Sequence, residues 1–89
     1  MSEDQRVVGQ KHVEATIAEM MREREVQSDA PVAWHQDFDR DVWVLEIKSA
    51  GQTRHWKFSG EDLADYPNDQ SVRRKVDSQL RMYVIPQKN

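Results

Sequence analysis

The sequence predicts an α+β fold, a two-layer α/β sandwich in which helices cover one face of a three-stranded antiparallel meander. Three observations predict it. A helical apolar pattern occupies the N-terminal third, three runs of alternating side chains follow, and helical periodicity returns near the C-terminus. Because the helices and the sheet each have one apolar face, they should pack together through those faces. The expected element order is α-β-β-β-α-α.

The first helix is expected between about residues 9 and 26. One face of it, at about 100° per residue, carries Val13, Ile17, Met20, Met21 and Arg24. The helix should end before Pro31, which lacks a backbone donor and disfavours helix in the residue before it. Residues 1–8 are mostly polar and charged, and we predict that they fray.

Three strands are expected over residues 32–38, 41–49 and 52–59, with turns at residues 39–40 and 50–51. These turns place three cross-strand rows on one face: Trp34–Leu45–Trp56, Val32–Ile47–Arg54 and Gln36–Trp43–Phe58. A slip of one residue at either turn would bring polar or charged side chains opposite the aromatic residues. Ala50 is a poor residue for a turn position with positive φ, but a four-residue loop would keep the same register.

Two helices are expected after the sheet. Ser59 can cap a short helix that holds Leu63 and Tyr66. Asn68 or Asp69 can cap a longer one, whose apolar stripe consists of Val72, Val76, Leu80, Tyr83 and Val84. Joining the helix stripes to the sheet face gives the expected core: Ile17, Trp34, Trp43, Leu45, Ile47, Trp56, Phe58, Val76 and Leu80.

Chain length and composition limit the possible classes of protein. The 89 residues make one domain, expected over residues 9–86, with residues 87–89 as a tail. The absence of cysteine excludes disulfides, thiolate zinc sites and a cysteine nucleophile, and it favours the cytoplasm. No run approaches the roughly 18 apolar residues of a membrane span. The formal net charge of −3 gives no general attraction to nucleic acid or to anionic membranes.

The sequence offers little support for catalysis or for a cofactor. It contains no glycine-flanked serine and no phosphate-binding glycine loop, since its only glycines are Gly9, Gly51 and Gly60. A chain this short also has little room for a deep pocket. We therefore expect a non-enzymatic protein that carries no cofactor.

Histidines and alternating carboxylates raise the question of a metal site. In the expected register His35 and His55 lie on the same open face of the sheet, about 9–10 Å apart with Glu46 between them. Zinc ligands must instead converge on one ion at about 2.0–2.1 Å. The first turn alternates Asp37, Asp39 and Asp41, but the glycine and glutamate of a calcium loop are absent. No metal site is expected.

The open face of the sheet is the leading candidate for partner binding. Val42 and Val44 lie at its centre, and charged or titratable side chains surround them. The predicted partner-binding residues are His35, Val42, Val44, Glu46, Lys48, His55 and Lys57. An apolar centre with a charged rim is typical of protein interfaces. We expect a regulatory or interaction module that binds another protein or a second copy of itself, with the strand preference of valine as the alternative explanation.

The last helix carries the second candidate surface. Four cations, Arg73, Arg74, Lys75 and Arg81, occur along its polar side. Basic patches of this kind can bind phosphates, and a solvated face that balances nearby acidic residues is the alternative. The α-β-β-β-α order resembles the topology of double-stranded-RNA-binding domains, which implies nucleic-acid binding through this helix. In this chain, however, the approach to the helix is acidic and a short helix intervenes, so no family is assigned.

Overall fold

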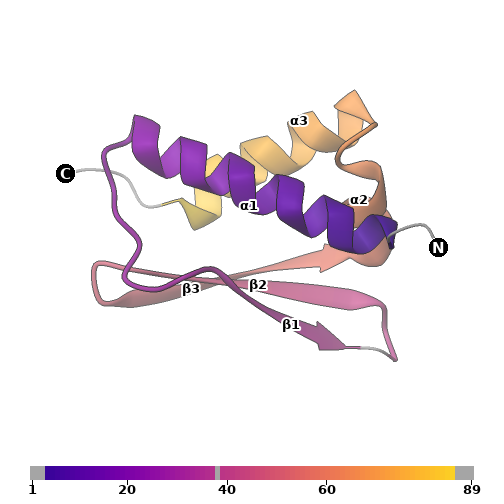
Figure 1. Cartoon of the computed structure of the whole chain (residues 1–89), viewed down its shortest axis with the longest axis horizontal. Coiled ribbons are helices and arrows are strands. Elements are labelled where there is room, and N and C mark those ends of the chain that lie inside the picture. Colours follow the sequence, from indigo (N-terminus) through magenta and orange to yellow (C-terminus); the bar gives the residue numbers. More distant parts are fainter. Residues whose placement is uncertain (1–3, 38, 86–89) are drawn as a thin grey trace.

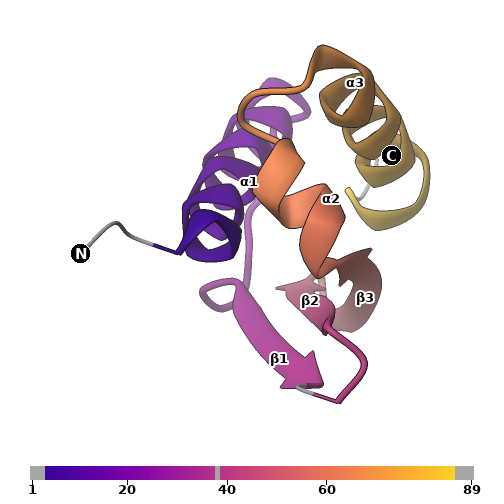
Figure 2. The same cartoon turned by 90° about the vertical axis from the view of Figure 1, so that its right-hand side faces the viewer.

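The computed structural model describes residues 4–37 and 39–85, and its elements follow the predicted order (Figure 1). They are α1 (Gln5–Glu23), β1 (Ala33–Asp37), β2 (Val42–Ser49), β3 (Gln52–Ser59), α2 (Gly60–Asp65), α3 (Gln70–Gln79) and the π-helix η1 (Leu80–Val84). The three strands form one antiparallel sheet in the order β1-β2-β3. Figure 2 sets the helices on the same side of this sheet, which confirms the two-layer α+β fold.

The first helix begins earlier than the sequence pattern predicts. Asp4 caps it by accepting a hydrogen bond from the backbone nitrogen of Arg6 at 2.8 Å, so residues 5–8 are helical rather than frayed. At the other end Arg24 is the C-cap, and Glu25 adopts a positive φ of 56°. The helix therefore ends shortly before the predicted boundary at residue 26. Residues 1–3 lie outside the described part of the chain.

The predicted register of the sheet is confirmed. Trp34 pairs with Leu45, and Leu45 pairs with Trp56. The second hairpin has the predicted two-residue loop, in which Ala50 and Gly51 adopt φ values of 53° and 76°. These two positive φ values are typical of a type I′ turn. Ala50 adopts this positive φ although its Cβ atom makes the left-handed conformation unfavourable.

The first hairpin keeps its predicted register. Asp37 pairs with Val42 as predicted, but β2 begins at Val42 and not at Asp41. Phe38, the predicted end of the first strand, lies outside the described part of the chain. Val32 precedes the first strand, so the predicted pair Val32–Ile47 lies beyond the end of β1.

The core lies between the sheet and the helices. Seven of the nine predicted core residues are buried, and Trp34 and Trp56 are only partly buried. Both tryptophans lie on edge strands, where the helix layer covers them incompletely. Trp34 directs its indole nitrogen to Glu14 on α1 at 2.8 Å. The buried core also includes Val13, Met20, Met21, Leu63, Tyr66, Val84 and Ile85.

The C-terminal helix does not stay α-helical to its end. After Gln79 the chain continues as the π-helix η1, which buries Leu80 and Val84 but leaves Tyr83 57% exposed. The predicted place of Tyr83 in the apolar stripe is therefore wrong. A π turn holds more residues than an α turn, so it changes which side chains face the core. None of the helices in residues 4–37 and 39–85 is long and apolar enough to cross a membrane.

Candidate functional site

The face of the sheet opposite the helices is open. Side chains alternate between the two faces of a strand, and the buried residues of β2 are Trp43, Leu45, Ile47 and Ser49. The residues between them therefore point away from the helix layer. Figures 1 and 2 show the helices on one side of the sheet, with no described element against the other side. The seven predicted partner-binding residues all lie on this face, which we call the open sheet face.

The apolar centre of the open sheet face lies on the middle strand. Val42 and Val44 are each half-buried, although no helix covers them. Val44 pairs with His35 on β1 and with Lys57 on β3, so its neighbours on both sides are polar. The arrangement is a small apolar strip with a polar border.

Glu46 links all three strands on this face. It pairs directly with His55 across β2 and β3, and it lies diagonally from His35 on β1. The Nε2 atom of His55 is 3.2 Å from one carboxylate oxygen, and the Nε2 atom of His35 is 3.5 Å from the other. The carboxylate is the least exposed of the three groups, at 20% against 53% and 63% for the histidines. The histidine rings therefore cover it from both sides.

These contacts change the electrostatics of Glu46. The hydrogen bond from His35 lowers the pKa of the Glu46 carboxyl below its ordinary value of 4.5, and His55 and Lys48 act in the same direction. Partial burial opposes them by favouring the neutral form. Because the lowering contributions prevail, Glu46 is an anion at neutral pH inside a ring of basic side chains.

The geometry of the His35–Glu46–His55 arrangement is that of a hydrogen-bonded cluster and does not fit a metal centre. Each histidine approaches a different oxygen of the carboxylate, so the three groups do not converge on one point. Within residues 4–37 and 39–85, no group of three histidine, cysteine or acidic side chains is arranged to hold a metal ion. What the cluster can do chemically is offer a carboxylate and two imidazole rings as hydrogen-bonding groups to a partner.

The carboxylates at the first hairpin have structural partners. Asp37 accepts hydrogen bonds from the backbone nitrogens of Asp39 and Arg40, at 3.1 and 3.3 Å. Asp41 pairs with the Nε atom of Arg6 on α1 at 3.2 Å. These two carboxylates therefore hold the turn and attach it to the helix layer.

Two of the four cations on the last helix make contacts within the protein. Lys75 pairs with Asp62 on α2 at 3.2 Å. The guanidinium of Arg73 lies over the ring of Tyr66, 5.4 Å from its centroid. Arg74 and Arg81 are exposed. The predicted basic surface thus contains two cations that already stabilise the helix layer and two that face solvent.

The sequence reasoning missed an aromatic pair at the edge of the sheet. Trp56 and Tyr83 are stacked, with ring centroids 5.6 Å apart and planes inclined by 4°. Tyr83 and its neighbour Met82 are the large hydrophobic residues that stay exposed in the described part of the chain. No signal in the sequence would have revealed them. An α-helical period that continues through residue 84 places Tyr83 on the buried side of the helix.

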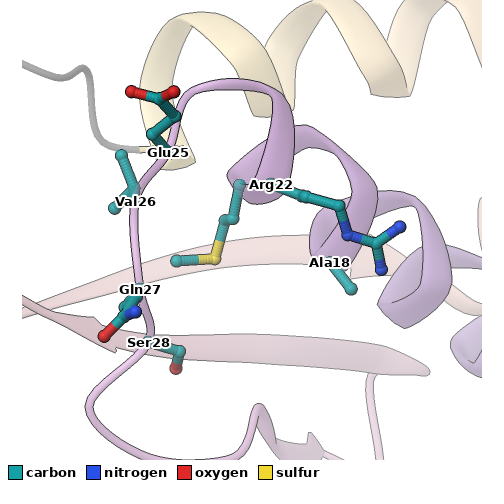
Figure 3. A pocket seen from close by; sticks show the side chains of 7 residues that line it. Ala18, Arg22, Glu25, Val26, Gln27 and Ser28 are labelled. Carbon is teal, nitrogen blue, oxygen red and sulfur yellow. The ribbon is translucent and has the colours of Figure 1, made fainter.

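A second missed feature is a hollow at the C-terminal end of α1. It has a volume of about 450 Å³ and is lined by Ala18, Met21, Arg22, Glu25, Val26, Gln27 and Ser28. Figure 3 shows that the side chains of Arg22, Glu25 and Ser28 point in different directions around it. With no set of polar groups directed at one point, the hollow offers no recognisable chemistry.

Comparison of the chain with models of protein families, with curated proteins and with solved structures finds no match.

Proposed function

We propose that this protein is a small non-enzymatic binding or regulatory module whose open sheet face docks onto another protein. The observation that carries the proposal is the half-buried pair Val42 and Val44, surrounded by charged side chains on a face that no described element covers. Protein interfaces commonly combine an apolar centre with a polar rim in this way.

The charges of the face indicate what kind of partner fits. Lys48 and Lys57 share the face with two carboxylates, Glu46 and Asp37, because Asp37 pairs with Val42 and so points to the same side. The face therefore carries charges of both signs around its apolar centre. Electrostatic complementarity favours a partner whose surface also presents both signs of charge.

The size of the face determines the strength of the contact. A stable interface buries about 800 Å² on each partner, and the apolar strip of two valines is only a small part of such an area. We therefore expect a weak or transient association, held by a few apolar contacts and steered by charge.

Replacing Val44 by Lys tests this proposal, with Val44→Thr as the matched control. The lysine adds a charge at the centre of the apolar strip, whereas threonine keeps the branched shape. We expect Val44→Lys to remove a specific protein from nuclease-treated pull-downs, and Val44→Thr to retain most of it. Capture of the same protein by Val44→Lys would place the interface elsewhere.

Nucleic-acid contact through α3 and η1 is the alternative proposal, and the exposure of Arg74 on α3 and Arg81 on η1 supports it. Each neutralised phosphate adds about 0.9 to the slope of log affinity against log salt for duplex DNA. The double variant Arg74→Ala, Arg81→Ala should therefore reduce that slope by about 2 in a duplex-binding titration. An unchanged slope would exclude these two residues from any such contact.

A further inference from the structure

The outer edge of β3 is a row of free backbone hydrogen-bonding groups. Ser49 and Gln52 flank the two-residue loop, so they pair through backbone hydrogen bonds as the first and last residues of a turn. Hydrogen-bonded and non-hydrogen-bonded pairs then alternate along the two strands. At the far end the backbone nitrogen of Gly60 donates to the carbonyl of Asp41 at 2.9 Å, in the same alternation.

It follows that the even-numbered residues of β3 direct their backbone groups to β2, and the odd-numbered residues direct theirs outward. The outward residues are Thr53, His55 and Lys57, and all three are exposed. Within the described parts of the chain, no backbone hydrogen bond from another element reaches them. An edge of this kind is a template for one more strand.

Apolar surface lies beside this edge. A hollow of about 330 Å³ is lined by His55, Trp56 and Lys57. Because consecutive residues of a strand face opposite sides of the sheet, a hollow that touches all three lies along the strand edge. Trp56 is stacked on the exposed Tyr83, with the exposed Met82 next to it in the chain. An incoming strand would therefore meet an aromatic surface as well as free backbone groups.

The charge of β3 selects the occupant. From Gln52 to Ser59 the strand contains Arg54, His55 and Lys57 and no acidic residue. Like charges placed opposite each other across two strands are destabilising, so the β3 strands of two copies would repel each other. The other edge strand, β1, spans Ala33–Asp37 and is shorter than β3, so it offers fewer outward backbone groups to an added strand.

We infer that the free edge of β3 accepts an extended acidic segment of another protein as an additional strand. Strand addition gains affinity from backbone hydrogen bonds and specificity from alternate side chains. Acidic residues of the segment would lie opposite His55 and Lys57, and the apolar residues between them would contact Trp56 and Tyr83. The inference goes beyond contact through the open sheet face and does not depend on it.

The test uses a short synthetic peptide that alternates glutamate with valine, and a matched peptide in which lysine replaces glutamate. Amide hydrogen exchange, followed by NMR, separates the two edges of the strand. The glutamate peptide should slow exchange at the amides of Thr53, His55 and Lys57 and leave those of Arg54 and Trp56 unchanged, because the latter already bond to β2. The lysine peptide should have no effect at any of the five.

Three variants, with Thr53→Ala as the control for the first, complete the test. Thr53→Pro removes an outward donor at a position where an edge strand tolerates proline, and it should weaken binding of the glutamate peptide about tenfold or more relative to Thr53→Ala. Lys57→Glu should reverse the preference between the two peptides. Val44→Lys should bind the glutamate peptide as the wild type does, which separates this site from the open sheet face.

The opposite results would overturn the inference. They are equal binding of both peptides, unchanged affinity in a folded Thr53→Pro variant, or slowed exchange that spares the outward amides. If a higher concentration of the protein alone slowed exchange at those amides, the edge of β3 would bind a second copy of this chain and not an acidic segment.

Discussion

Tyr66 is a single residue that joins all three helices of the α layer. It is the C-cap residue of α2, its side chain is buried, and its hydroxyl donates a hydrogen bond to Asp77 on α3 at 2.5 Å. The same hydroxyl lies 2.9 Å from Thr16 on α1. Burial, together with the hydrogen bond to the neighbouring carboxylate of Asp77, raises the pKa of Tyr66 to about 12. Ionisation would place a phenolate beside that carboxylate.

Alkaline pH should therefore destabilise the fold through Tyr66. Because its pKa is raised on folding, its contribution is complete below the ordinary value of 10.0 and is lost as pH rises towards about 12. Urea unfolding of the wild type and of Tyr66→Phe at a series of pH values isolates this contribution. The wild type should be more stable by about 1–3 kcal/mol at pH 8, and the difference should shrink above pH 10. Parallel curves across that range would contradict the assignment.

At the residue scale, the sequence predicts side-chain direction better than side-chain burial. Alternation places Trp34 and Trp56 on the core face, where they lie. Their partial exposure follows from their place on the edge strands, which depends on how far the helix layer extends over the sheet. The Tyr66–Asp77 bond was not predicted either, because it joins helices whose relative placement the sequence does not define.

Among the secondary-structure elements, α1 and α2 pack without a side chain between them. A Cβ atom on Gly9 would lie 1.8 Å from the carbonyl oxygen of Leu63, inside the backbone of the other helix. Because that neighbour is backbone and cannot rotate away, the glycine is required by the close approach of the two helices.

Gly9→Ala should consequently destabilise the protein, although alanine is the better helix former. Overpacking of this kind costs about 1–3 kcal/mol, measured as the free energy of unfolding in urea. The control is Glu19→Ala on the exposed side of the same helix, which should change stability by less than about 0.5 kcal/mol. A Gly9→Ala variant as stable as the wild type would show that the two helices do not pack this closely.

Strands and helices differed in how well the sequence predicted them. The register of the sheet followed from two short turns, since a slip would have placed polar side chains opposite aromatic ones. The end of the last helix did not follow, because helical periodicity cannot distinguish an α turn from the π turn at Leu80–Val84. That difference exposes Tyr83 and so creates the aromatic surface beside β3.

For the whole molecule, the two layers leave the sheet with two different faces. One face is buried under the helices, and the other carries Val44 and the His35–Glu46–His55 cluster. The sequence predicted which residues belong to each face. The contacts that join Glu46 to both histidines required the structure, since they depend on the side-chain conformations of all three residues.

The central claim is that β2 separates a core face from a binding face, and neighbouring residues on that strand test it directly. The measurement is the free energy of unfolding and the capture of a specific protein partner for Leu45→Ala and Val44→Lys. Leu45 is fully buried, so Leu45→Ala should lose about 2–5 kcal/mol and still capture the partner while it is folded. Val44→Lys should stay within about 1 kcal/mol of the wild type and lose the partner. A Val44→Lys variant that unfolds, or one that folds and captures the partner as before, would contradict the account.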